Sequence, residues 1–322
     1  MTFLDQLRDL APGELAARLD EFTESATGDP GAGGYLDAQR ALYLLSVARW
    51  QPSWESIVPA ADHTDVVLAA LRLSRAWHRA DTDRVLGGME LPGIPEFGDW
   101  LDDRCRAHAS GPQHQLFDFL ENRATEAQLR EFVFQETPFD IHFGDLVAAL
   151  IPGVYGAAKL ELSHNFWDEM GNGDLKRTHR QLRLNMMSEV GIDAGAHIDG
   201  LDTFWVEELE LANMYLGSST DRTLMAQALG MLLATEHVVP GRIDRQIKGW
   251  LRVGYGLDQL EYLTEHVTVD VAHAAGWLNE VVQPVLAAHP ECLPDIVAGV
   301  ERRLAGSLRV CDVALRKLSS AA

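Results

Sequence analysis

The chain has 322 residues, of which 47% are hydrophobic, and its formal net charge is −21. This length and composition suffice for a large core, whereas the acidity disfavours nucleic acid and anionic membranes as partners. The three cysteines are widely spaced without a CxxC pair, so neither a disulfide framework nor a thiolate zinc site is expected. The N-terminus lacks the apolar region of a signal peptide, and no apolar run reaches membrane-spanning length. We therefore expect a cytoplasmic protein.

Helical periodicity dominates the sequence, and no segment shows the convincing alternation of a β-strand. Thr125 and Gln128 form a capping box at the start of one helix, Pro152 and Gly153 are expected to kink or break another, and Asp174 can cap the segment after it. The expected helical segments cover residues 36–50, 63–80, 125–136, 143–174, 175–191, 203–217, 221–240, 241–256, 258–288 and 293–320. The pattern predicts an all-α helical bundle.

Two stretches rich in glycine and proline interrupt this pattern, at residues 24–35 and 87–100. The first is typical of a surface loop. The second could separate an N-terminal helical layer, residues 1–120, from the main bundle, residues 121–322. Three roles are open for the N-terminal layer: packing on the bundle, forming a homodimer interface, or covering a pocket.

The segment EHVTVDVAH, residues 265–273, places two histidines and an aspartate on one helical stripe. His266, Asp270 and His273 occupy positions i, i+4 and i+7, which fall within roughly 60° of one another on a helix. Valines flank the stripe, so it does not have the pattern of a solvated face. Two imidazoles and a carboxylate suit iron, manganese or zinc. The alternative is a polar seam satisfied by hydrogen bonds.

Further candidate ligands lie on other helices, because a bundle core can hold a metal when facing helices each contribute a carboxylate or a histidine. Glu236 lies in a very apolar segment, where it is either buried or at an exposed last turn before Pro240. Glu169 and His179 flank a glycine-containing turn that could direct both inward. Alternatively, they are a helix-end carboxylate and a surface histidine.

An additional carboxylate is less well defined by the sequence. Glu136 follows Phe132 by four residues and so shares its helix face. Glu161 competes with it, because Glu161 and His164 form an ExxH pattern of the kind found in bundle di-iron proteins. We favour Glu136 over Glu161 by a small margin.

The order of these residues resembles the haem-oxygenase-like di-iron oxidases and oxygenases, also called iron-containing redox enzymes. The family's HxxxDxxH pattern is fully matched by residues 266–273, and Glu236 lies at the expected distance upstream. The family's turn of Asp, Glu, an aromatic residue and glycines, followed by a histidine, is matched by DEMGNGDLKRTH, with Met170 at the aromatic position. The resemblance covers roughly residues 125–290.

The resemblance implies a haem-oxygenase-like helical bundle without haem, here with an extra N-terminal helical layer. It implies two Fe(II)/Fe(III) ions per chain, O2 as co-substrate and an external electron donor. The implied metal ligands are Glu169, His179, Glu236, His266, Asp270 and His273, with Glu136 carried over as a seventh. Among them, the carboxylates with an implied catalytic role are Glu169, Glu236 and Asp270. Open positions for O2 or substrate are typical of a catalytic site.

Family members catalyse different reactions, and the resemblance favours N-oxygenation of a small amine or amino-acid-derived substrate to an N-hydroxy or nitro product. The alternative is oxidative C–C cleavage or desaturation of an amino or fatty acid. Glu207, Glu208 and Glu210 are candidate substrate anchors, although a solvated helix start explains them as well. Two other classes stay open: a haem-binding protein, which the carboxylate-rich set argues against, and a metal-free thiaminase-like or scaffold bundle.

Overall fold

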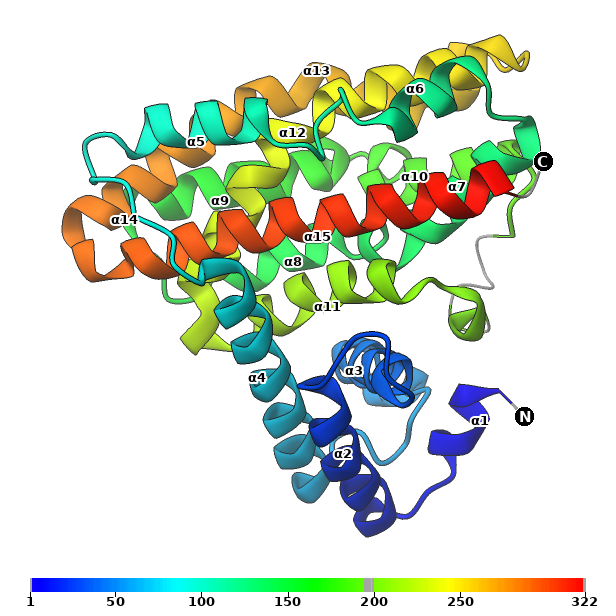
Figure 1. Ribbon diagram of the computed structural model, residues 1–322, viewed down its shortest axis with the longest axis vertical. Helices are drawn as coiled ribbons and strands as arrows, with labels where there is room; N and C mark the ends of the chain where they lie inside the picture. Colours follow the sequence, from blue (N-terminus) through cyan, green and yellow to red (C-terminus); the bar gives the residue numbers. More distant parts are fainter. Residues whose placement is uncertain (1, 194–197, 199, 321–322) are drawn as a thin grey trace. The chain divides into compact units, whose positions relative to one another are not determined.

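Every regular element in the described part of the computed structural model is a helix (Figure 1). The structure describes residues 2–193, 198 and 200–320, and of residues 268–272 it describes the backbone alone. The predicted all-α fold is therefore confirmed. Among the described residues, no helix is both long enough and apolar enough to cross a lipid bilayer.

Contacts group the chain into two compact units. The first contains residues 1–87 and 195–217, and the second contains residues 88–194 and 218–322. The predicted boundary near residue 120 falls inside the second unit, because the helices between residues 97 and 122 pack against those of the larger group. A grouping by contacts does not test where independent domains begin, so the division at residue 120 stays a prediction.

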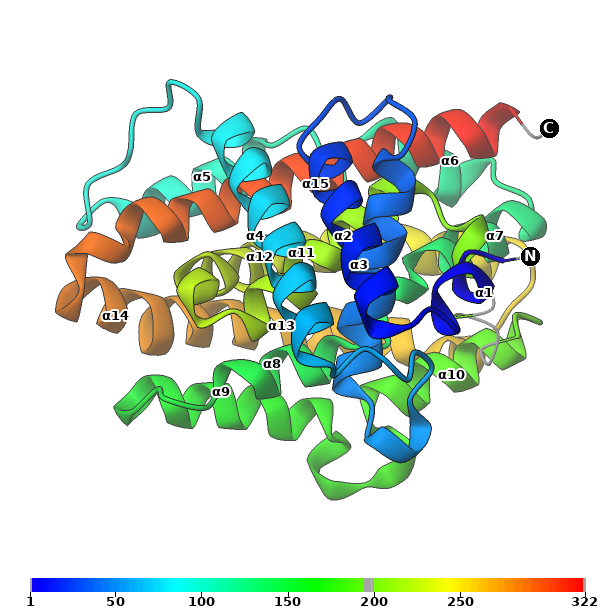
Figure 2. The ribbon, with the colours of Figure 1, turned by 90° about the horizontal axis from the view of Figure 1, so that it is seen from below.

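The first unit is a small helical layer. Its helices are α1 (Phe3–Arg8), α2 (Pro12–Ala26), α3 (Tyr35–Trp50), α4 (Thr64–Leu86) and most of α11 (Val206–Thr220). Helix α2 packs along α4 and α3 (Figure 2). Leu15, Leu19 and Trp77 are fully buried in this layer, which gives it an apolar core of its own.

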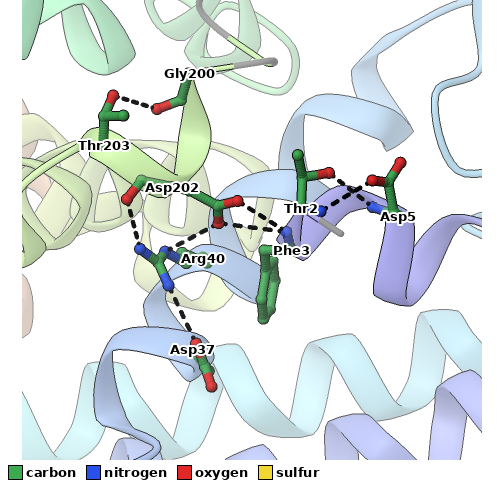
Figure 3. A network of polar contacts seen from close by, with 8 residues as sticks. All are labelled: Thr2, Phe3, Asp5, Asp37, Arg40, Gly200, Asp202 and Thr203. Atoms are coloured by element: carbon green, nitrogen blue, oxygen red, sulfur yellow. Dashed lines mark hydrogen bonds and ion pairs between the residues drawn. The ribbon is translucent and has the colours of Figure 1, made fainter.

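A polar network ties the distant segment 195–217 to the start of the chain (Figure 3). The backbone N–H of Phe3 donates to the carboxylate of Asp202 at 3.0 Å, and Arg40 donates to the Asp202 carbonyl oxygen at 2.7 Å. Arg40 also pairs with Asp37 in its own helix at 3.3 Å. These hydrogen bonds join residues that are far apart in the sequence, and they explain why residues 195–217 group with residues 1–87.

The second unit holds the remaining helices, and its longest members run side by side (Figure 1). Its helices are α5 (Phe97–Ala107), α6 (Gln115–Asn122), α7 (Glu126–Asp140), α8 (Phe143–Leu150), α9 (Gly156–Glu169), α10 (His179–Glu189), α12 (Met225–Arg252), α13 (Glu261–Gly276), α14 (Gln283–Ala288) and α15 (Leu293–Ser320). Helix α12 packs against α15, α13 and α6, and α8 lies beside α9 (Figure 2).

Glycines allow α12 and α15 to approach closely. A Cβ atom on Gly230 would lie 2.0 Å from the carbonyl oxygen of Ile296, and one on Gly299 would lie 2.1 Å from that of Gln227. Because real Cβ atoms do not approach so closely, the two backbones can touch only at residues without a side chain. This packing places α12, and with it Glu236, in the interior of the unit.

The predicted helix boundaries hold in some places and shift in others. The capping box of Thr125 and Gln128 is present, and α8 and α9 are separate helices on either side of Pro152. In contrast, residues 225–252 form one helix that continues through Pro240, where the sequence predicts two segments. Asp174 caps only a short 3-10 turn, and Thr178 is the N-cap of α10.

Candidate metal centre

A tight turn joins the two helices that carry Glu169 and His179. Glu169 is the last residue of α9 and His179 is the first residue of α10. Gly171, between them, has a φ of +59°, and a Cβ atom there would lie 2.5 Å from the carbonyl carbon of Arg177. Only glycine fits such a conformation without strain. The turn thereby brings Oε1 of Glu169 to 2.9 Å from Nδ1 of His179.

The contact between Glu169 and His179 is close but poorly aligned. Both side chains are buried, and Nδ1 of His179 has no hydrogen-bond partner despite the short distance. Burial by itself lowers the pKa of His179, but the adjacent Glu169 carboxylate outweighs it, so the pKa is raised overall. A buried nitrogen and a buried carboxylate oxygen that face each other without a proper hydrogen bond suit two ligands of one cation.

His266 lies next to this pair, with one ring nitrogen already engaged. Its Nδ1 lies 2.7 Å from the carbonyl oxygen of Tyr262, one turn earlier in α13. A carbonyl only accepts, so this nitrogen carries the proton and Nε2 keeps the lone pair. The His266 ring lies 4.8 Å from that of His179 and 4.5 Å from that of Tyr262, between centroids. Burial, followed by the positive charge of His179, lowers the pKa of His266.

His273 lies between two carboxylates. Its Nε2 is 3.0 Å from Oδ2 of Asp168, and its Nδ1 is 3.7 Å from Oε2 of Glu236. Glu236 is only 4% exposed, which excludes the exposed last turn that the sequence left open. Burial raises the pKa of Glu236 against the opposing effect of His273, and the charge of Glu169 raises it further.

The pairs Glu169–His179 and Glu236–His273 are close enough to influence each other electrostatically. The charge of Glu169 affects Glu236, and the charge of His273 affects His179. Asp270 lies between His266 and His273 in α13, but its side chain is outside the described part of the structure. Within the described part, no three His, Cys, Asp or Glu side chains already form a group able to hold a metal ion. The candidate ligands instead lie in carboxylate–imidazole pairs.

Asp168 is the residue of this centre that the sequence did not single out. Its Oδ2 contacts Nε2 of His273 at 3.0 Å. Burial alone would raise the pKa of Asp168, but hydrogen bonds from His273 and Asn172 lower it. Its position immediately before Glu169, at the glycine turn, is the one signal that could have indicated its role.

The additional carboxylate stays unassigned. Glu136 is partly buried, and burial, followed by the charge of Asp140, raises its pKa to about 8. Within the described residues, it accepts a hydrogen bond from Gln246, whose Nε2 lies 3.4 Å away. Asp140 pairs with Arg183 at 2.8 Å, and its charge reaches His266. The assignment of Glu136 as a ligand therefore stays a prediction.

Glu161, the competing candidate, packs against α13. A Cβ atom on Gly276 would lie 2.0 Å from Oε1 of Glu161, so this side chain packs against the end of α13. His164, its partner in the ExxH pattern, is exposed, with 64% of its side chain accessible. Nε2 of His164 nevertheless lies 3.7 Å from Oδ2 of Asp168, which contacts His273, so His164 borders the centre from its exposed side, whereas Glu161 packs against Gly276.

Glu208 and Glu210, two of the three candidate substrate anchors, do not lie on a solvated helix start. Glu208 and Glu210 are each 2% exposed, within the first unit. Glu210 accepts a short hydrogen bond from the hydroxyl of Tyr35, which also accepts from Nε1 of Trp77 at 3.1 Å. Burial and the Glu210 carboxylate raise the pKa of Tyr35. These contacts stabilise the layer of α3, α4 and α11.

Comparisons with known proteins identify the family of the chain. Residues 130–307, more than half of the chain, match the sequence model of a family described as iron-containing redox enzymes. A curated relative, nitrosourea synthase from Streptomyces achromogenes subsp. streptozoticus, is 27% identical over 248 residues, which cover 68% of this chain and 51% of that protein. The matched region thus spans about half the length of that relative.

Solved structures support the fold. Two crystal structures of a CADD-like protein of unknown function from Nostoc punctiforme PCC 73102 superpose with TM-scores of 0.55 and 0.54. Their sequences are 15% and 17% identical to this chain, and each superposition covers 71% of this chain and 96% or 98% of the other. At this identity the likeness concerns the fold alone.

Proposed function

The chain belongs to the iron-containing redox enzymes, and we propose that it uses two irons and O2 to oxygenate the nitrogen of a small amine or amino-acid-derived substrate. The observation that carries this proposal is the pair of buried carboxylate–imidazole contacts, Glu169–His179 and Glu236–His273, with His266 beside them. Buried carboxylates and imidazoles are stable in such numbers only when they are paired with one another or with a cation.

The donor set suits iron. Three imidazoles and two or more carboxylates are the mixed nitrogen and oxygen ligands that ferrous iron accepts. Glu169, His179, Glu236, His266 and His273 would hold the metal, together with Asp270 from the same stripe of α13. Bound iron would supply electrons for the reduction of O2, and an external donor would replace them.

The surrounding residues would orient the ligands and exclude water. The Tyr262 carbonyl fixes the ring of His266, and the guanidinium of Arg183 stacks over the Tyr262 ring at 5.2 Å from its centroid. Burial keeps the Tyr262 phenol protonated by raising its pKa well above the ordinary value. A dry, fixed set of side chains strengthens electrostatic interactions with a bound metal and protects reactive species from water.

The choice of N-oxygenation is supported by the relative. Nitrosourea synthase is named for making a nitrosourea, a compound that contains an oxidised nitrogen. For a primary amine, one oxygenation consumes O2, two electrons and two protons, and it yields a hydroxylamine and water. The nitrogen is oxidised and O2 is reduced, so an external electron donor balances the reaction.

The proposal is tested by incubating the Fe(II)-loaded protein with ascorbate, O2 and a panel of amines and amino acids. We expect at least one substrate to gain 16 mass units on conversion to its hydroxylamine, and 18 mass units when ¹⁸O2 is supplied. The variant His273→Ala should yield no product, whereas Asp83→Ala, which changes an exposed acid of α4, should behave as wild type. Products oxidised at carbon alone would overturn N-oxygenation while leaving iron chemistry intact.

A further inference from the structure

His273 is held from both sides of its ring. Asp168 faces Nε2 at 3.0 Å, whereas Glu236 faces Nδ1 at the longer distance of 3.7 Å. His273 is 4% exposed, so water does not compete freely for these contacts. The shorter contact is a hydrogen bond, and the longer one, an ion pair, exceeds ordinary hydrogen-bond length.

Asp168 is itself fixed in place. Asn172, in the glycine turn, donates from Nδ2 to Oδ1 of Asp168 at 3.0 Å, whereas Oδ2 contacts His273 at 3.0 Å and is also faced by Nε2 of the exposed His164 at 3.7 Å. The residue is the next-to-last of α9, directly before the candidate ligand Glu169. The carboxylate is thus anchored by the same turn that positions Glu169 and His179.

The contact with Asp168 determines which nitrogen of His273 is available to a metal. An ionised carboxylate only accepts hydrogen bonds, so the nitrogen that faces it carries the proton. A histidine that binds a metal keeps one ring proton, and Asp168 holds that proton on Nε2, so the nitrogen that gives up its proton to a metal is Nδ1, on the side of Glu236. Carboxylates that fix a metal-binding histidine in this way are a recurring feature of metal sites.

We infer that Asp168 is a positioning residue that makes His273 bind metal through Nδ1, whereas His266, whose Nδ1 donates to the Tyr262 carbonyl, binds through Nε2. This inference rests on the proposed function, because it presumes a metal at the centre. Two histidines on one stripe of α13 thus present opposite ring nitrogens. Asp168 acts through His273 and is not itself a ligand.

Zinc-loaded protein with ¹⁵N-labelled histidine tests the inference directly, because Zn(II) is diamagnetic and takes the same ligand types. Long-range ¹H–¹⁵N correlation spectra distinguish protonated from metal-bound ring nitrogens. We expect His273 to show a protonated Nε2 and a metal-bound Nδ1, and His266 to show the reverse. The signals are assigned by their loss in His273→Ala and His266→Ala. A metal-bound Nε2 in His273 would overturn the inference.

Two variants separate positioning from direct ligation. Asp168→Ala removes the acceptor and should weaken Zn(II) binding by roughly 10–100-fold, as loss of such supporting contacts does elsewhere. Asp168→Asn keeps an oxygen that accepts from Nε2, so it should retain the wild-type nitrogen assignment and recover most of the affinity. Asp83→Ala serves as the control for loss of one negative charge. If Asp168→Asn is as weak as Asp168→Ala, or if both bind one metal fewer, Asp168 is a ligand and the inference fails.

The experiment distinguishes this inference from the proposed function. Binding of Zn(II) with the expected nitrogen assignment, together with no oxygenation of any amine, would reject the function and retain the positioning role. The opposite assignment in an active oxygenase would reject the positioning role alone. Failure of wild-type protein to bind Zn(II) or Fe(II) would reject both.

Discussion

Oε1 of Glu169 and Nδ1 of His179 lie 2.9 Å apart, although ten residues separate them in the sequence. The turn at Gly171 permits this short distance. The chain can turn so tightly only at glycine, because a side chain there would collide with the backbone of Arg177. We expect Gly171→Ala to weaken Fe(II) or Zn(II) binding by at least about tenfold, since the turn must open by more than ligand geometry tolerates. Metal titration of the purified variant provides the measurement.

A matched variant controls for backbone strain alone. Gly156 has a similar φ of +68°, but a Cβ atom there would meet nothing within 4 Å. Gly156→Ala should cost about 1–2 kcal/mol of stability through its left-handed conformation and leave metal affinity unchanged. Equal losses of affinity in both variants would show that the turn has no specific role.

The ion pair between Arg104 and Glu301 should stabilise the second unit. Arg104 donates to both carboxylate oxygens of Glu301, at 2.6 and 2.7 Å, and joins α5 to α15. Glu301 is 4% exposed, so removing its partner leaves a nearly buried charge. We expect Arg104→Ala to lower the free energy of unfolding by about 1–3 kcal/mol, measured by denaturant titration. Asp103→Ala, which breaks an exposed pair with Arg106, should change it by less than about 0.5 kcal/mol.

The close approach of α12 and α15 predicts an unusual response to alanine. Alanine normally favours a helix over glycine by about 1 kcal/mol. At Gly230, however, the added methyl would overlap the carbonyl of Ile296, so Gly230→Ala should destabilise the protein by at least about 1–3 kcal/mol. Thermal unfolding followed by circular dichroism measures the change. Gly13→Ala, in α2 with nothing within 4 Å, should be neutral or stabilising, and a similar result at Gly230 would disprove the close packing.

The three cysteines should differ in reactivity. Cys105 and Cys311 are buried, whereas Cys292 is partly exposed. Burial, followed by the charges of Asp102 and Glu301, raises the pKa of Cys105 to about 12, so its reactive thiolate is scarce near neutral pH. We expect Ellman's reagent at pH 8 to modify one thiol per native chain rapidly and the other two only after unfolding. Rapid reaction of all three would contradict the buried positions.

The raised pKa of Cys105 makes the free energy of unfolding depend on pH. The folded state keeps the Cys105 proton at a pH where the unfolded chain, with a thiol pKa near 9.0, has lost it. The unfolded state therefore binds fewer protons between about pH 9 and pH 12, and the stability from this group falls as pH rises through that range. Cys105→Ala should show a weaker alkaline loss of stability in denaturant titrations from pH 8 to 11 than the wild type does.

The sequence predicted the helical fold and grouped His266, Asp270 and His273 on one stripe of a helix. Periodicity and the spacing of residues 266–273 carry this information, because they depend on local helix geometry. The burial of Glu236 could not be read from the sequence, since Pro240 suggests a helix end and only tertiary packing keeps α12 continuous.

The sequence could not predict which side chains from distant parts of the chain contact each other. Asp168 meets His273 across 105 residues, and no local pattern specifies such a pair. Glu208 and Glu210 look like a solvated helix start, yet both are buried, and Tyr35 of α3 donates to Glu210. Contacts of this kind depend on how the helices pack, which side-chain chemistry alone does not determine.

The central claim is that these residues hold two irons that react with O2. Anaerobic titration of wild type and His273→Ala with Fe(II), followed by mixing with O2 and measurement of O2 consumed, tests it most directly. The account predicts close to two irons per wild-type chain, rapid O2 consumption in the presence of a reductant, and loss of both stoichiometric binding and O2 consumption in His273→Ala. A wild-type chain that binds no stoichiometric iron, or whose iron uptake and O2 consumption survive His273→Ala unchanged, would contradict it.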